Sequence, residues 1–195
     1  TLLASSAASD VYKRQIFCGG AVLAQQKVEM IPFGNMDQWV DRQIKESGII
    51  GGATKNVYAI GPTATITENK VYKNMGGSPW ATSNVMARVA GITKTNTSVF
   101  PEKRGDGFCA RMDTRMESVK VFGLVDITVL AAGSMFLGEV HEPIKGTKNP
   151  QKMLNSGIPF TKKPVAIQFD YKVKMSDREK RLRATGFSKI TCLLY

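Results

Sequence analysis

The sequence predicts an all-β protein, a sandwich of antiparallel strands, on two observations. Apolar and polar residues alternate with period two over several short runs, most regularly over residues 164–175, and this period is that of a half-buried strand. The runs are separated by turn formers such as Gly105-Asp106-Gly107, which favours an antiparallel sheet over a helix bundle. A chain of 195 residues, 43% of them hydrophobic, has room for one substantial core.

Each expected strand is predicted from a separate run of apolar or alternating residues. Residues 36–44 fit both a helical face and a strand, and the β-rich surroundings favour the strand, with Trp39 in the core. Trp80 is expected to lie in a loop rich in glycine, serine and proline, beside Asn84. The other expected strands, ended by glycine, proline or polar residues, span 55–60, 85–90, 108–114, 125–132, 134–138 and 164–175, with a return strand over 183–189.

The ends of the chain are expected to lie outside the domain. Residues 1–15 and 191–195 resemble translated sequencing-adaptor read-through at the ends of metagenomic fragments, so both are set aside as non-native. Residues 16–24 are apolar and end in Val-Leu-Ala, which fits the remnant of a secretory signal cleaved before Gln25. We therefore expect a single domain over residues 25–190, secreted or at the cell surface, and no transmembrane segment.

Charge and cysteines narrow the function classes. The net charge is +11, but the basic residues are scattered, and the cluster over 172–183 lacks the interleaved aromatics of a nucleic-acid module, so no nucleic-acid partner is expected. Only Cys109 of the three cysteines lies in the body of the chain, which disfavours a zinc site. A catalytic pair of Cys109 as nucleophile and His141, the single histidine, as base is also disfavoured.

Six stretches together resemble the family described as the "putative carbohydrate metabolism domain" of secreted bacterial proteins, over roughly residues 28–187. The resemblance implies a galactose-binding-like jelly roll with a glycan or polysaccharide partner. The family continues well past residue 195, so the resemblance implies a domain truncated at its C-terminal end, with exposed strand edges. The stretches are 31–34 with Trp39, 44–52, 79–84, 107–111, 132–138 and 157–172.

A sugar site needs an aromatic face together with planar polar groups in loops at the rim of a sandwich. Trp80, Asn84, Arg104 and Asp106 are the candidates. In the alternative interpretation Trp80 fills the end of the core and Arg104 pairs with Asp106. Jelly rolls of this type often carry a structural calcium ion, for which Asn35 and Asp37 are the nearest ligands.

Three functions follow, in this order. The first is a non-catalytic module that binds or presents glycan. The second is a carbohydrate-active enzyme resembling a glycoside hydrolase, which needs two carboxylates across a cleft. The third is a structural or adhesive protein of the cell surface. The carboxylates available for the second are Glu102, Asp106, Asp113, Glu139, Glu142 and Asp170.

Overall fold

A computed structural model of the chain describes residues 28–67, 69–72, 77–121, 125–146, 150–163 and 166–173. The chain divides into two compact units. One spans Lys27–Phe160, and the other combines Thr1–Gln26 with Thr161–Tyr195. The expected leader, the two adaptor-like ends and the return strand over 183–189 lie outside the described residues.

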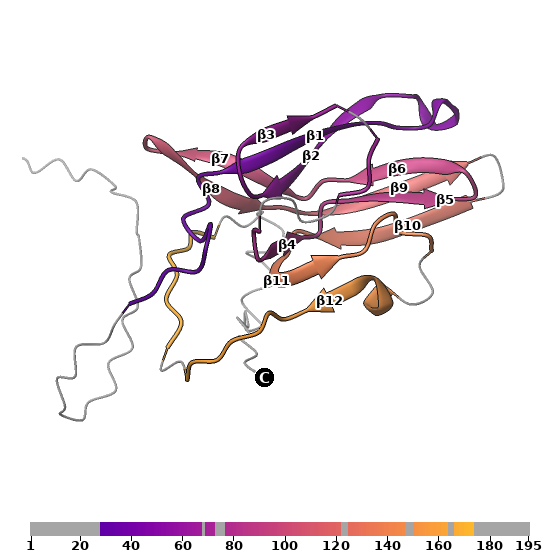
Figure 1. The fold of residues 1–195 in the computed structure, drawn as a ribbon. Coiled ribbons are helices and arrows are strands. Elements are labelled where there is room, and N and C mark those ends of the chain that lie inside the picture. Colours follow the sequence, from indigo (N-terminus) through magenta and orange to yellow (C-terminus); the bar gives the residue numbers. More distant parts are fainter. Residues whose placement is uncertain are drawn as a thin grey trace, which may run out of the picture. The chain divides into compact units, whose positions relative to one another are not determined.

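The larger unit is built from strands, and the predicted all-β class is confirmed (Figure 1). Neighbouring strands pair in the orders β2-β1-β3, β12-β11-β4, β5-β6, β7-β8 and β10-β9, and every ladder is antiparallel except β1–β3. Two short 3-10 helices, Gly48–Ile50 and Pro150–Met153, interrupt them. The strands are β1 Trp39–Lys45, β2 Thr54–Ile60, β3 Ala64–Ile66, β4 Trp80–Thr82, β5 Val85–Val89, β6 Ile92–Asn96, β7 Val99–Arg104, β8 Gly107–Met112, β9 Thr114–Val121, β10 Val125–Ala132, β11 Met135–Val140 and β12 Leu154–Ser156.

Strand β1 is central in its sheet and shows how the alternation is used. Val40, Arg42 and Ile44 point to one face and are almost completely buried. The strand expected over residues 36–44 is thus present as β1, which begins at Trp39, and Trp39 lies in the core as predicted. One charged residue, Arg42, therefore occupies a core position and needs a partner inside the protein.

Two clusters of buried side chains make the core. Trp39, Ile60 and Val99 form the first, with Trp80 and Phe108 among the partly buried side chains that pack against it. The second cluster contains Ile44, Val57 and Met86, which come from β1, β2 and β5. Both clusters join residues far apart in the sequence, so packing between the ladders holds the unit together.

Local turn chemistry explains the hairpin of β5 and β6. Ala90 and Gly91 connect the two strands, and both have positive φ angles, of 49° and 76°. Two-residue hairpin loops favour this left-handed conformation because its twist matches the right-handed twist of the strands. The direct pairing of Val89 with Ile92 follows.

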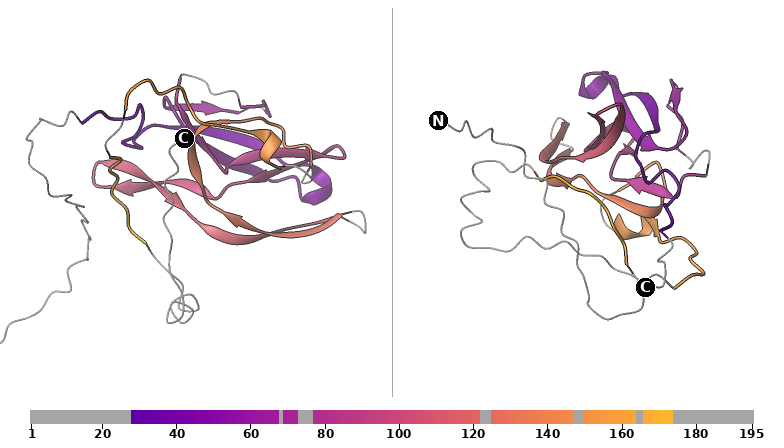
Figure 2. Two further views of the ribbon diagram at one scale, coloured as in Figure 1. Left: turned by 90° about the horizontal axis from the view of Figure 1, so that it is seen from below. Right: turned by 90° about the vertical axis from the view of Figure 1, so that its left-hand side faces the viewer.

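Backbone hydrogen bonds connect the separate ladders. The Ser83 amide donates to the Ser134 carbonyl at 3.0 Å, and the Ile144 amide donates to the Met86 carbonyl at 3.0 Å. The second bond carries the segment after β11 alongside β5, where Ile144 and Ala87 form an isolated parallel bridge. Figure 2 shows the same strands from two further directions. The chain is thereby folded so that the end of β11 returns toward β1 and β5.

Two expectations about strands are wrong. Trp80 does not lie in a loop, because it opens β4 and pairs with Leu137 of β11. Residues 166–173, the most regular alternation in the sequence, are not assigned as a strand. Their apolar side chains are about half exposed, with Phe169 and Tyr171 in ring contact at 5.9 Å between centroids. Alternation defines an apolar face, and a strand forms only where another strand pairs with it.

Candidate ligand-binding site

A cleft of about 380 Å³ opens in the larger unit, where β1, β2, β4 and the end of β11 meet. Its lining is mixed. Tyr72 and Trp80 contribute aromatic rings, Arg42 and Glu142 contribute charged groups, and His141 lies beside them. Cavities of this size that combine aromatic walls with a few polar groups are typical of small-molecule sites.

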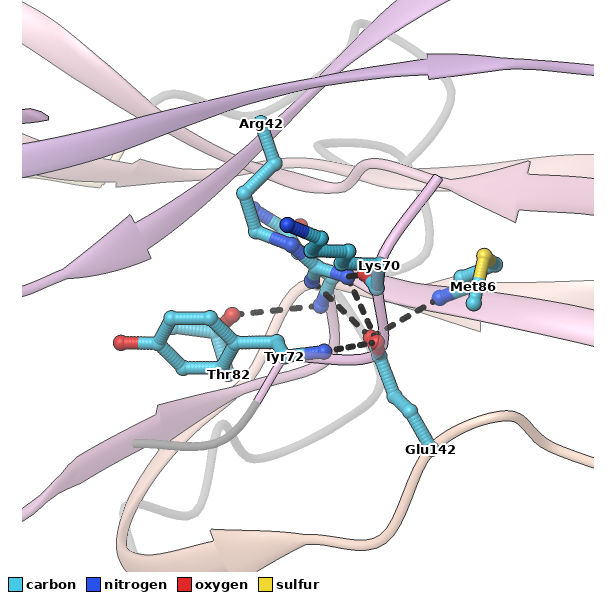
Figure 3. A network of polar contacts seen from close by, with 7 residues as sticks. Arg42, Lys70, Tyr72, Thr82, Met86 and Glu142 are labelled. Atoms are coloured by element: carbon cyan, nitrogen blue, oxygen red, sulfur yellow. Dashed lines mark hydrogen bonds and ion pairs between the residues drawn. The ribbon is translucent and has the colours of Figure 1, made fainter. Parts of the chain in front are cut away.

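A buried ion pair between Arg42 and Glu142 lies in this lining (Figure 3). Arg42 Nη1 donates to Glu142 Oε1 at 3.0 Å, and Nη2 donates to Oε2 at 2.6 Å. Both side chains are only 2–3% exposed. Two parallel bonds between a guanidinium and a carboxylate are the strongest form of ion pair, and they offset part of the cost of burying both charges.

The Glu142 carboxylate also accepts two backbone hydrogen bonds. The Met86 amide donates to Oε1 at 3.0 Å, and the Tyr72 amide donates to Oε2 at 3.1 Å. Figure 3 shows these bonds converging on the carboxylate from different strands and loops. Two guanidinium nitrogens and two backbone amides of the described residues thus donate to this carboxylate, and Glu142 joins β1, β5 and the segment of residues 69–72 at one point.

The wall formed by residues 69–72 is held in place by further contacts. Arg42 Nη2 donates to the Lys70 carbonyl at 3.3 Å, and the guanidinium lies 5.0 Å from the centroid of the Tyr72 ring. Asn69 Oδ1 accepts from the Lys45 amide and Asn69 Nδ2 donates to the Lys45 carbonyl, each at 2.8 Å. The side chain thus pairs with Lys45 as the backbone of a neighbouring strand would. Tyr72 is thus positioned as an aromatic wall before any ligand arrives.

Of the predicted site residues, the cleft brings Trp80 and Asn84 together. Trp80 packs against the first core cluster, and its Nε1 donates to the Pro32 carbonyl at 2.8 Å, so it serves both the core and the cleft. The Asn84 amide group is fully used: Nδ2 donates to the Tyr58 and Val99 carbonyls, and Oδ1 accepts from the Ser98 and Val99 amides. Because the backbone already uses both groups of this amide, Asn84 offers a ligand in the cleft van der Waals contact only.

Arg104 and Asp106 lie elsewhere. They belong to the tip of the β7–β8 hairpin, where both are exposed, and neither lines the cleft. Within the described part of the chain, no ion pair joins the two side chains, so their expected pairing is not present there. The structure therefore separates the four candidates into two places.

Asp37, supported by Asn35, forms a hydrogen bond to the start of β8. Asn35 Nδ2 donates to Asp37 Oδ2 at 2.8 Å. The other carboxylate oxygen, Asp37 Oδ1, accepts from the Phe108 amide at 2.8 Å. Gly107 permits this approach, because a Cβ there would overlap Asp37 Oδ1. Among the residues with a described position, no group of three histidine, cysteine or acidic side chains is placed to hold a metal. Calcium binding at Asn35 and Asp37 stays a prediction.

Sequence reasoning missed Arg42 and Tyr72, and it named Glu142 only as one of the carboxylates available to a hydrolase. The alternation over residues 36–44 contained one signal for Arg42, since this residue lies between Val40 and Ile44 on the apolar face of a predicted strand. A charged residue at a core position indicates a buried partner. Nothing in the sequence identified that partner, since Glu142 lies 100 residues further along the chain.

The fold and the cleft define the class: an all-β domain of antiparallel ladders with a concave aromatic and charged site. Comparison with family models then gives the family. Residues 55–185 match the model described as "Putative carbohydrate metabolism domain", and the chain belongs to this family. The match covers every residue of the cleft lining except Arg42.

Two other comparisons return nothing. Neither the curated proteins nor the solved structures include a match to this chain. Within the described ranges, no helix is long and apolar enough to cross a membrane.

Proposed function

We propose that this chain is a non-catalytic carbohydrate-binding module and that the cleft beside the Arg42–Glu142 pair is its ligand site. The observation that carries the proposal is the lining of the cleft, which combines Tyr72 and Trp80 with the exposed Glu139 and His141. Aromatic side chains cover the apolar face of a sugar ring, and polar groups at the rim bond its hydroxyls. The carbohydrate-related family supports the same ligand class.

The state of the carboxylates favours binding over hydrolysis. Glu139 and Glu142 both line the cleft, which is the first requirement of a glycoside hydrolase. Glu142 is unsuited to the chemistry, however, because Arg42 and two backbone amides occupy both of its oxygens. A general acid must carry a proton and a nucleophile must reach the sugar. Glu139 is left as a binding group for hydroxyls.

Export remains part of the proposal. The apolar stretch of residues 16–24 carries it, as the remnant of a secretory signal, and an extracellular glycan is the ligand that suits an exported module. Fusion of residues 16–30, preceded by an added start methionine and a short basic segment, to a reporter that is active only after export tests this. A reporter that stays inactive would remove the export part and leave the ligand site untouched.

Glycan-array screening followed by calorimetry tests the binding site. We expect His141→Ala and Glu139→Gln each to weaken binding of a neutral oligosaccharide about tenfold, the loss of one good hydrogen bond. Asp106→Asn is the matched control, because it removes an exposed carboxylate outside the cleft. Trp80→Phe keeps an aromatic ring and loses the bond to Pro32, so it separates stacking from core packing. Unchanged affinity in both rim variants would contradict the site.

A further inference from the structure

A second polar surface lies on the outward face of the β7–β8 hairpin. Val99 and Ala110 face the first core cluster, so the alternate residues of the two strands point outward. The contacts confirm this, because Arg111 reaches both Phe100 and Glu102 across the ladder. We name the arginine–aromatic surface the set formed by Phe100, Arg104 and Arg111 of this face together with the adjoining Tyr58 of β2 and Arg115 of β9.

Phe100 is the centre of this surface. The guanidinium carbon of Arg111 lies 4.6 Å from its ring centroid, and that of Arg115 lies 5.9 Å from it. The Tyr58 ring contacts Phe100 at 6.1 Å between centroids, with the planes tilted by 59°. Guanidinium groups stacked on an aromatic ring keep a fixed plane, so their edges present N–H donors in a defined direction.

The same arginines are held in place by further bonds. Arg111 forms ion pairs with Glu102 through Nη1 and with Asp113 through Nε, both at 3.2 Å, and Arg115 donates to the Thr97 carbonyl. Arg111 Nη2 has no hydrogen-bond partner among the described residues, although the side chain is 46% exposed. Arg104 is likewise exposed, without a partner in that part of the chain.

The chemistry of these groups selects an anionic ligand. A guanidinium with free N–H groups matches the planar oxygens of a carboxylate or the oxygens of a sulfate. Arg104 and Arg111 place two guanidinium groups on this face, and the whole chain carries a net charge of +11. The half-buried rings of Tyr58 and Phe100 add apolar contact area beside the donors.

We propose that the arginine–aromatic surface binds the carboxylate or sulfate groups of an acidic polysaccharide. This inference rests on the proposed glycan-binding function but uses a different place on the molecule. Arg111 Nη2 and Arg104 make charge-assisted hydrogen bonds to the acidic groups, while Phe100 and Tyr58 contact the sugar rings. The ligand spans the hairpin and reaches it independently of the cleft.

Dextran, dextran sulfate and carboxymethyl dextran test the proposal, since they share one backbone and differ in charge. We expect the full chain to bind both charged polymers and not dextran, with affinity that falls as salt rises. Arg104→Gln and Arg111→Gln are each expected to weaken binding about tenfold, the loss of one charged hydrogen bond. Arg104 has no described partner to disturb, so its variant remains informative if Arg111→Gln is destabilised.

Lys55→Gln is the matched control. It removes one positive charge from the opposite face of β2, since Lys55 alternates with Asn56 and Tyr58. An equal loss in Lys55→Gln would show that net charge alone drives binding and would overturn the proposal. Binding of dextran itself with the affinity of dextran sulfate would do the same. Tighter binding of an oligo-thymidylate with the same dependence on Arg104 would assign the surface to single-stranded nucleic acid instead.

The cleft variants separate this inference from the proposed function. Glu139→Gln and His141→Ala are expected to leave dextran sulfate binding unchanged, because neither residue belongs to the hairpin face. If no neutral glycan binds the cleft while Arg104 still controls dextran sulfate binding, the proposed function fails and this inference holds. The reverse pattern rejects the arginine–aromatic surface alone.

Discussion

Two stretches of the chain alternate in the same way and end in different environments. In β1, Val40, Arg42 and Ile44 are buried to 2% exposure or less between strands β2 and β3. In residues 166–173, Ile167, Phe169, Tyr171 and Val173 alternate as regularly, and their exposed fractions are 48–59%. The more hydrophobic of the two patterns is the one left exposed. Hydrophobicity selects the face that a strand would bury, and the partner strand decides whether it is buried.

Arg42, the charged residue among the three buried in β1, extends this comparison from apolar to charged side chains. Arg42 is as buried as its apolar neighbours, because Glu142, the Lys70 carbonyl and the Tyr72 ring provide contacts for its guanidinium. Arginine normally predicts exposure, yet Arg42 is buried. The four apolar residues of the stretch 166–173 predict burial, yet they are exposed. The tertiary partners account for both departures.

Breaking the buried ion pair should have the largest effect. Glu142→Gln leaves Arg42 as an uncompensated buried charge, and we expect a loss of about 3–5 kcal/mol in the free energy of unfolding. Urea denaturation followed by tryptophan fluorescence measures it. Arg42→Met combined with Glu142→Gln should lose less than the sum of the two single changes, since the pair is coupled.

The exposed ion pair between Glu102 and Arg111 is the control for that prediction. Its side chains are about half exposed, so Glu102→Gln should cost less than about 1 kcal/mol. Equal losses in Glu102→Gln and Glu142→Gln would contradict the structural role assigned to the buried pair.

Truncating one apolar residue in each alternating stretch tests the comparison directly. Ile44 has no exposed surface, and Ile44→Ala should cost about 2–5 kcal/mol because it leaves a cavity. Phe169 is 52% exposed, and Phe169→Ala should change the free energy of unfolding by less than about 0.5 kcal/mol. Chemical denaturation of both variants in one buffer provides the measurement. A loss at Phe169 as large as at Ile44 would show that residues 166–173 are packed in solution.

Asp41 should make stability depend on pH. Burial raises its pKa, and its Oδ1 has no hydrogen-bond partner, while Oδ2 accepts from Asn56 at 3.1 Å. With the folded pKa above the unfolded one, the folded state binds the proton more tightly. The stabilising contribution is complete below the unfolded pKa and is lost as pH rises through the folded pKa.

Asp41→Asn removes this titration. We expect the variant to gain stability relative to the parent as the pH rises from 4 to 7, and to show a flatter stability profile over that range. Thermal unfolding across that range is the measurement, and Asp106→Asn, at an exposed site, serves as control. A parent and variant with parallel profiles would exclude Asp41 as the source.

The smallest change in stability is expected from polar substitutions on the exposed apolar face. An alternating apolar segment without a strand partner favours intermolecular pairing, so the chain should self-associate at micromolar concentration. Ile167→Lys with Phe169→Glu should reduce that association in light scattering and leave the melting temperature nearly unchanged. Ala166→Lys with Gln168→Glu is the matched control on the alternate positions. A parent chain that is monomeric with a sharp, cooperative melt would contradict the expectation.

The candidate site was only partly predictable from sequence. Trp80 could be recognised because a large aromatic beside turn formers and polar residues is typical of a sugar site. Asn84 has the right chemistry in sequence, yet its amide is consumed by four hydrogen bonds to the backbone. Arg104 and Asp106 were grouped with them by residue type, and strand pairing places them at the tip of a hairpin.

The sequence by itself determined the local structure of this protein. Period-two alternation and turn residues gave the all-β class, the position of β1 and the strands around β8, β10 and β11, because side-chain direction in a strand depends only on residue order. The tertiary structure decided which faces are covered, that Arg42 meets Glu142, and that Trp80 shares a cleft with Tyr72. These outcomes depend on contacts between residues far apart in the chain, and no local pattern specifies which distant strand or side chain fills a given place.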